Sequence, residues 1–280
     1  MTKHIYQKTV VLLALAILLP CVSALAQTDM DLDTEFGGRI SAGLDKKITK
    51  GLHLTLEEEA RMAENFGSLS RLQTTLGVRY KVLPYLRFGL GYVLINPYDT
   101  DSGSFSSARH RFYFDITGTL SLGAWNFSLK ERLQATHRTG YFNEYQNPAT
   151  ALMLKSRIMA KYKGFVKVEP YAYFEMRHYL NAPVINASFD GTNYYTPTGS
   201  RKGDAGWFLE GFNGCYANRY RSCVGVEMEI TKQHAVELYI LADYISEKKV
   251  DANAEGTKLK SYTLQKGWVM NLGAAYVFSF

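Results

Sequence analysis

"GLHLTLEEEARM", residues 51–62, alternates apolar residues with polar or charged ones along most of its length. Successive side chains of a strand point to opposite faces, so this alternation predicts a strand with one apolar and one charged face. The apolar face holds Leu52, Leu54, Leu56, Ala60 and Met62. The opposite face holds His53, Thr55, Glu57, Glu59 and Arg61.

The same division recurs along the chain. Further strands are predicted at about 32–44, 69–82, 86–94, 107–122, 125–138, 150–163, 165–180, 218–231, 234–247 and 260–280. With 51–62, this gives eleven strands. Most are longer than the five or six residues usual in soluble strands, and their length suits tilted strands that cross a membrane.

A soluble sandwich of two sheets is the alternative, because its strands also alternate. However, the apolar faces here are nearly free of charge, whereas the opposite faces concentrate Arg, Lys, Glu and Asp. That distribution favours a barrel with an apolar outside and a charged lumen. The sequence therefore predicts an all-β fold, a transmembrane antiparallel up-and-down β-barrel.

The links between strands alternate in length, which predicts the orientation of the barrel. Short turns occur near 83–84, 123–124, 163–164 and 232–233, and longer polar links occupy 63–68, 96–106, 139–150, 181–217 and 248–259. Outer-membrane barrels place short turns in the periplasm and long loops outside. Such a barrel has an even number of strands and its chain starts in the periplasm. It would then have twelve strands if 27–48 contains one more, or ten strands if that segment lies in the lumen. We favour twelve.

The first residues, "MTKHIYQKTVVLLALAILLPCVSALAQ", predict a secretory signal peptide over 1–26. Two lysines precede an apolar run that ends at Leu19, and small residues at Ala24 and Ala26 fit a cleavage site. The run is too short for a membrane anchor. Lipidation of Cys21 is disfavoured because Pro20 precedes it. We expect one domain, the barrel, over 27–280.

Charge argues against a nucleic-acid partner. The whole chain has a net charge of +6, and loss of Lys3 and Lys8 with the signal leaves +4, which is too mild for such a role. The expected partners are outer-membrane lipid, lipopolysaccharide and the barrel-assembly machinery. The sequence names no external ligand.

The last predicted strand ends in "NLGAAYVFSF", residues 271–280, with alternating apolar residues and a final aromatic. The last strand of a barrel must pair with the first, so we expect this end to be ordered rather than frayed. The pattern of Tyr276, Phe278 and Phe280 also resembles the signal by which outer-membrane assembly machinery recognises its clients.

Three segments carry a family resemblance: "KKITKGLHLTLEEEARM" at 46–62, "GVRYKVLPYLRFGLGY" at 77–92 and "VEPYAYFEMR" at 168–177. Through them the chain resembles a family of Gram-negative outer-membrane barrels known as domain of unknown function 2490. The resemblance covers most of the mature chain. It implies a barrel fold and an outer-membrane location, and it implies no reaction.

The charged inner faces are the first candidate for a functional region. The side chains expected to line the lumen are Arg71, Arg79, Arg87, Arg109, Arg111, Arg132, Arg157, Arg177, Arg219, Arg221, Glu57, Glu59, Asp115, Glu169, Glu175, Glu227, Glu229, Glu237 and Asp243. They could pair across strands and fill a narrow lumen, as in a structural or surface-binding barrel. Alternatively, they could line a narrow channel whose excess of arginine favours small solutes or anions.

A lipid-modifying outer-membrane enzyme is a third alternative. His110, His137, His178 and His234 fall on outward faces. None has a Ser and an acid at a spacing that would assemble a nucleophile, a base and an orienting group. We therefore predict no catalytic residues.

Metal binding is not indicated either. Glu57, Glu58 and Glu59 do not share one face, and no His or Cys cluster has ligand spacing. We predict no metal and no cofactor.

Cys215 and Cys223 are the cysteines that remain after removal of the signal. In an oxidising compartment a pair eight residues apart suggests a disulfide that closes a small loop, and two separate thiols are the alternative. Cys215 lies in the long link 181–217 and Cys223 lies just beyond it. This link mixes Tyr194, Tyr195, Trp207, Phe208 and Phe212 with Gly and Asn. This link is expected either to bind glycans or proteins outside the cell or to fold inward as a lid.

Overall fold

The computed structural model describes residues 28–31, 35–185, 188–189, 194–195, 209–256 and 259–280. The predicted signal peptide lies outside these residues, as do Trp207 and Phe208. The strands are β1 (Thr28–Asp31), β2 (Glu35–Thr49), β3 (Leu52–Ala63), β4 (Ser68–Leu83), β5 (Leu86–Asp99), β6 (Ser104–Phe105), β7 (Arg109–Leu122), β8 (Trp125–Arg138), β9 (Thr150–Tyr162), β10 (Val168–Ile185), β11 (Ser188–Phe189), β12 (Tyr194–Tyr195), β13 (Leu209–Glu229), β14 (His234–Ala252) and β15 (Leu259–Ser279).

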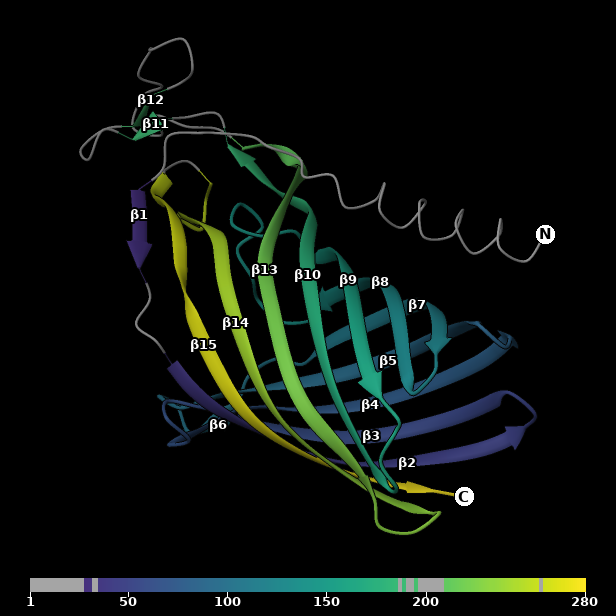
Figure 1. The fold of residues 1–280 in the computed structure, drawn as a ribbon. Helices are drawn as coiled ribbons and strands as arrows, with labels where there is room; N and C mark the ends of the chain where they lie inside the picture. The colour runs from purple at the N-terminus through teal and green to yellow at the C-terminus, as the bar shows by residue number, and fades with distance from the viewer. Residues whose placement is uncertain (1–27, 32–34, 186–187, 190–193, 196–208, 257–258) are drawn as a thin grey trace, which may run out of the picture.

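Eleven of these strands form a closed barrel (Figure 1). Neighbours along the order β2-β3-β4-β5-β7-β8-β9-β10-β13-β14-β15 pair antiparallel, and β15 returns to β2. Closure leaves no free edge along the paired strands, which is how a sheet avoids unsatisfied backbone groups. The predicted all-β barrel is confirmed, and each of the eleven predicted strands has its counterpart.

The extra strand expected in 27–48 exists as β1, but it does not make a twelfth member of the ring. Both β1 and β2 run parallel to β15: Thr28 pairs with Thr263, Glu35 pairs with Val269, and the register shifts by one residue between the two strands. β1 and β2 therefore lie end to end along the same side of β15. An odd number of alternating strands must close with one parallel pair, so the expected even ring with an antiparallel closure is wrong.

The two ends of the barrel differ in their links. The short-turn end carries the links at 50–51, 84–85, 123–124, 163–167 and 230–233, and the opposite, long-link end carries 64–67, 100–108, 139–149, 186–208 and 253–258. β2 starts at the long-link end and the chain ends at the short-turn end (Figure 1). The predicted alternation of link lengths is confirmed, but the first ring strand starts at the end opposite to the one expected.

The C-terminus is fixed to the first ring strand. The amide of Phe280 donates to the carbonyl of Asp45 at 3.0 Å, and the amide of Lys47 donates to the carbonyl of Phe280 at 2.9 Å. The Phe280 ring stacks on Phe278 with centroids 5.4 Å apart, and the Lys46 ammonium lies 5.0 Å from its centroid. These contacts hold the last residue in the sheet, as expected from the sequence.

The long link is shorter than predicted, because strand extends into both ends of 181–217. β10 continues to Ile185 and β13 begins at Leu209. Their pairing carries register shifts at Arg177/His178 and at three further points up to Ile185. Each shift interrupts the period of two, so alternation could not reveal this part of either strand.

The link 139–149 joins β8 to β9 but reaches the far end of β14. The Asn143 amide donates to the carbonyls of Ala252 and Asn253 at 3.0 and 3.2 Å, and Gln146 donates to Asp251 at 2.6 Å. Because β9, β10 and β13 separate β8 from β14 in the ring, the link crosses part of the long-link end. In Figure 1 it passes behind β13.

Aromatic side chains form two rows on the outer face. One row follows Phe174, Tyr220, Tyr244 and Trp268 on the four consecutive strands from β10 to β15, with centroid separations of 6.5, 6.4 and 5.2 Å. Near the short-turn end, Trp125 contacts Tyr162 at 5.0 Å and His234 contacts Phe278 at 5.0 Å. Between the rows the outer face exposes apolar residues such as Leu238, Ile240 and Leu272.

Glycine on the inner face makes room for tyrosine. Gly91 on β5 lies opposite Tyr113 on β7, and a Cβ at Gly91 would overlap the tyrosine ring. We expect Gly91→Ala to destabilise the refolded barrel by about 1–3 kcal/mol, since overpacking forces the ring from its rotamer. Urea denaturation measures the effect. Gly118→Ala on β7 is the control, because nothing lies within 4 Å of its added Cβ. Equal stability of the two variants would contradict the packing described.

Among the described residues, no helix has the length and hydropathy needed to cross a bilayer.

Candidate functional site

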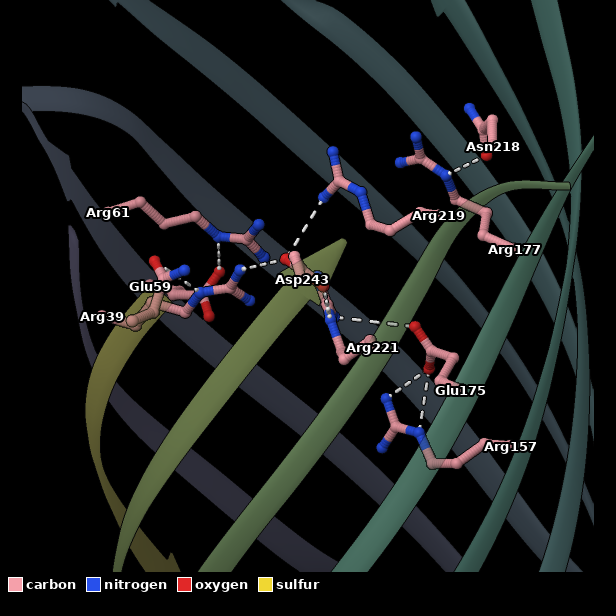
Figure 2. Close-up of polar contacts among 11 residues, drawn as sticks. Arg39, Glu59, Arg61, Arg157, Glu175, Arg177, Asn218, Arg219, Arg221 and Asp243 are labelled. Carbon is pink, nitrogen blue, oxygen red and sulfur yellow. Dashed lines mark hydrogen bonds and ion pairs between the residues drawn. The ribbon is translucent and has the colours of Figure 1, made fainter. Parts of the chain in front are cut away.

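Asp243 on β14 is the centre of a charged network inside the barrel. Its side chain is almost completely buried, and Arg221 on β13 binds both carboxylate oxygens, with Nε 2.7 Å from Oδ1 and Nη2 2.9 Å from Oδ2. Arg219 and Arg39 approach Oδ2 at 3.5 and 3.7 Å (Figure 2). One carboxylate therefore neutralises parts of three guanidinium groups.

The network continues around the wall through Glu175 on β10. Arg157 on β9 donates to Glu175 Oε2 from Nε at 2.9 Å and from Nη2 at 2.6 Å. Arg221 lies 3.6 Å from Oε1 of the same carboxylate and so links Glu175 to Asp243 (Figure 2). Alternating charges thus run from β9 through β10, β13 and β14 to Arg39 on β2.

Two further groups extend this charged layer to the other strands. Arg132 on β8 holds Asp115 on β7 by two hydrogen bonds of 2.6 and 2.7 Å, and its guanidinium lies 3.9 Å from the Tyr113 ring centroid. Arg61 donates to Glu59 at 2.5 Å, and Gln73 donates to the same oxygen at 2.9 Å. Paired and stacked arginines of this kind have little freedom to move.

A cavity of about 330 Å³ lies inside the charged layer. Every one of the eleven ring strands contributes to its lining. Charged residues dominate, with eight basic side chains and four carboxylates, and Tyr113, Tyr171, Tyr173 and Tyr239 complete the wall. On the long-link side, Arg177 reaches Asn218 at 2.8 Å and Glu247 at 4.0 Å.

The charged residues predicted to line the lumen lie on the inner face, but they do not form one site. Arg111, Arg132, Arg157, Arg221, Glu57, Glu59 and Glu175 line the cavity. Arg177, Arg219 and Asp115 lie in the network beside it. Arg79 pairs with Asp45, Glu169 and Glu227 pair with Lys161, Arg71 lies opposite Arg61, and Arg109 lies opposite Arg138.

Two important inner-face residues were absent from that prediction. Arg39 sits in the first ring strand, where alternation with Phe36, Ile40 and Leu44 could have revealed it. Lys155 lies on β9, opposite Arg132 and Arg177 on its two neighbouring strands. Lys155 is two residues from Arg157 and so falls on the same face of the strand, and this spacing could have revealed it.

The predicted disulfide is wrong. Cys215 and Cys223 both lie on β13, and the structure does not join them. Eight residues of extended chain span about 26 Å, whereas the Cα atoms of a disulfide lie within about 7 Å. The prediction placed Cys215 in a loop, but the early start of β13 makes it part of a strand.

The outer face contains a serine, an acid and a histidine on neighbouring strands. Ser156 on β9 donates to Glu131 on β8 at 2.6 Å, and His178 lies on the adjacent β10. Neither ring nitrogen of His178 has a hydrogen-bond partner. A nucleophile needs a base that accepts its proton, but here the hydroxyl is bonded to the carboxylate and the imidazole stands apart. The described residues also contain no group of three or more potential metal ligands.

Comparisons with known proteins identify a family and a likeness to solved structures. A family model described as "Protein of unknown function (DUF2490)" matches residues 40–198. No curated protein matches the chain. Among solved structures, the chain is similar to the outer-membrane expressed OmpT of Vibrio cholerae, with 12% identity and a TM-score of 0.32. The match covers 76% of this chain and 60% of that chain, so it spans less than two thirds of the solved protein.

Proposed function

The chain belongs to the DUF2490 family, and we propose that it is an outer-membrane β-barrel with a lumen closed to ions. In this proposal the barrel has a structural or surface-binding role. Its apolar outer face contacts lipid and lipopolysaccharide, and the assembly machinery inserts it. The long-link end faces outward and the short-turn end faces the periplasm.

The height of the apolar band is the observation that carries the membrane location. Along β15, ten residues separate Trp268 of one aromatic row from Phe278 of the other. At about 3.3 Å per residue and a tilt of about 40°, this path rises roughly 25 Å. Outer-membrane barrels have an apolar band of about that height between two aromatic girdles. Trp268 and Leu272 are exposed on the same face of β15, and soluble proteins rarely expose large apolar patches.

The paired charges support a closed lumen. Asp243, Glu175 and Asp115 each hold an arginine through two hydrogen bonds, which fixes these side chains at the height of the cavity. Beside the cavity, Arg177 pairs with Glu247 and Arg219 pairs with Asp243, and the link 139–149 crosses part of the long-link end. In this proposal, the fixed side chains leave no continuous water path of the kind that a general diffusion pore needs.

Planar-bilayer recording tests the closed lumen. We expect refolded protein that shows the heat-dependent gel mobility of a folded barrel to give no steady conductance steps. Vesicles refolded without protein and a general porin provide the two controls. Regular steps would contradict the proposal, and anion-selective steps would favour the narrow anion channel, which the excess of arginine and lysine around the cavity supports as the second candidate.

A further inference from the structure

We propose that the cavity in the lumen binds a small anion with two or more negative charges, held by Arg111 and Lys155. This inference concerns binding inside the barrel, and it does not require transport through it. It follows from the charge around the cavity, from the partners of each cation and from the size of the space.

The lining of the cavity is strongly basic. The cations are Arg39, Arg61, Arg111, Lys130, Arg132, Lys155, Arg157 and Arg221. The carboxylates are Glu57, Glu59, Glu175 and Glu237. Even with Asp115 and Asp243, which lie directly behind this lining, two positive charges have no acidic counterpart. Enclosed like charges repel more strongly than charges in water, so the arrangement favours an added anion.

The missing partners belong to two particular side chains. Six of the eight cations have a carboxylate oxygen within 4.0 Å. Arg111 and Lys155 have none among the described residues; Arg111 donates from Nε to the Thr136 hydroxyl at 3.0 Å. Glu175 is the main acidic neighbour of Lys155, but Arg157 and Arg221 also contact this carboxylate, so it cannot balance all three cations. Arg111 and Lys155 are therefore the least compensated cations of the lining.

The neighbours of Lys155 increase its need for an anion. Its directly opposite residues are Arg132 on β8 and Arg177 on β10, which are both cations. Like charges directly opposite each other destabilise a sheet. A dianion between Lys155 and Arg111 would be attracted by all of these groups and would replace repulsion by charge-assisted hydrogen bonds.

A third cation extends the site on the side of β4. Arg71 faces the lumen opposite Arg61, and its buried Nε has no hydrogen-bond partner. Arg111 is among its electrostatic neighbours. Guanidinium groups bind phosphate and carboxylate oxygens in pairs, so this side chain adds donors of the right chemistry.

The cavity is large enough for such a ligand. Its volume of about 330 Å³ lies at the lower limit of small-molecule sites, which span roughly 300–1,000 Å³. Tyr113 and Tyr173 stack on Arg132 and Arg157, which keeps those two cations directed at Asp115 and Glu175. Arg111 and Lys155 remain available for a compact anion.

Calorimetric titration of the refolded barrel with pyrophosphate tests the site. We expect saturable binding of one pyrophosphate per chain, and Lys155→Met should weaken it about tenfold or more, because one charge-assisted hydrogen bond is lost. Lys155→Arg should retain most of the binding. Lys161→Met is the matched control: it also removes an inner-face lysine, but Lys161 pairs with Glu227 and Glu169 outside the cavity.

A stability measurement separates binding from folding defects. Pyrophosphate should raise the urea midpoint of the wild type and of Lys161→Met, since a ligand stabilises the state that binds it. It should leave the midpoint of Lys155→Met nearly unchanged. Absence of saturable binding, or equal weakening by Lys155→Met and Lys161→Met, would overturn the proposal. Neither result depends on whether the barrel conducts.

Discussion

Asp243→Asn is expected to destabilise the refolded barrel by about 3–5 kcal/mol, the cost of breaking a buried ion pair by removal of one partner. The side chain is 2% exposed and is the shared acceptor of Arg221, Arg219 and Arg39. An amide has the same shape but cannot neutralise them, and its NH₂ group would point at donors. Urea denaturation in lipid vesicles, followed by tryptophan fluorescence, measures the change.

Glu227→Gln is the control for this prediction. Glu227 also pairs with a lysine on the inner face, Lys161, at 2.6 Å, but its side chain is 44% exposed. Exposed pairs contribute about 0–1 kcal/mol, so this variant should lie close to the wild type. If Asp243→Asn were no less stable than Glu227→Gln, the network around Asp243 would not be a major determinant of stability.

Removal of Phe280 is expected to lower the amount of protein in the outer membrane severalfold while leaving the stability of the assembled barrel less affected. The residue joins β15 to β2 through the hydrogen bonds of its amide and carbonyl with Asp45 and Lys47, and its ring packs on Phe278. These contacts close the ring, so they form when the first and last strands meet. Fractionation and immunoblotting of outer membranes measure the level.

Phe280→Tyr is the matched control, because it keeps both the backbone bonds and an aromatic ring. We expect it to reach nearly wild-type levels, with Phe280→Ala between the two. Normal outer-membrane levels of the truncated protein would contradict a role for this residue in assembly. Refolding of purified truncated protein in vesicles separates a defect of assembly from one of stability.

Alternation predicted most of the fold because each strand is in contact with two different environments. Leu238, Ile240 and Leu272 face outward and Asp243 and Asn271 face inward, and a period of two records this division directly. The method failed where the backbone departs from that period. The register shifts in β10 hid the extensions to Ile185 and Leu209, and with them the strand position of Cys215.

Ring closure could not be predicted from the same pattern. A parallel and an antiparallel contact of β2 with β15 give identical alternation, since side-chain direction depends only on position in the strand. The contacts in the lumen could be predicted only in part. The alternation of side chains along each strand predicted that Arg221 and Glu175 point inward. Which arginine pairs with which acid depends on the register between strands, and one sequence does not specify that register.

The most direct test of a lipid-facing barrel is spin-label accessibility along β15 in outer membranes. Labels would be placed singly at Met270, Asn271, Leu272 and Ala275 in a background with Cys215→Ser and Cys223→Ser. We predict that labels at Met270 and Leu272 are relaxed by oxygen dissolved in lipid, whereas labels at Asn271 and Ala275, which lines the cavity, are shielded from it. Equal oxygen accessibility at all four positions would contradict the account.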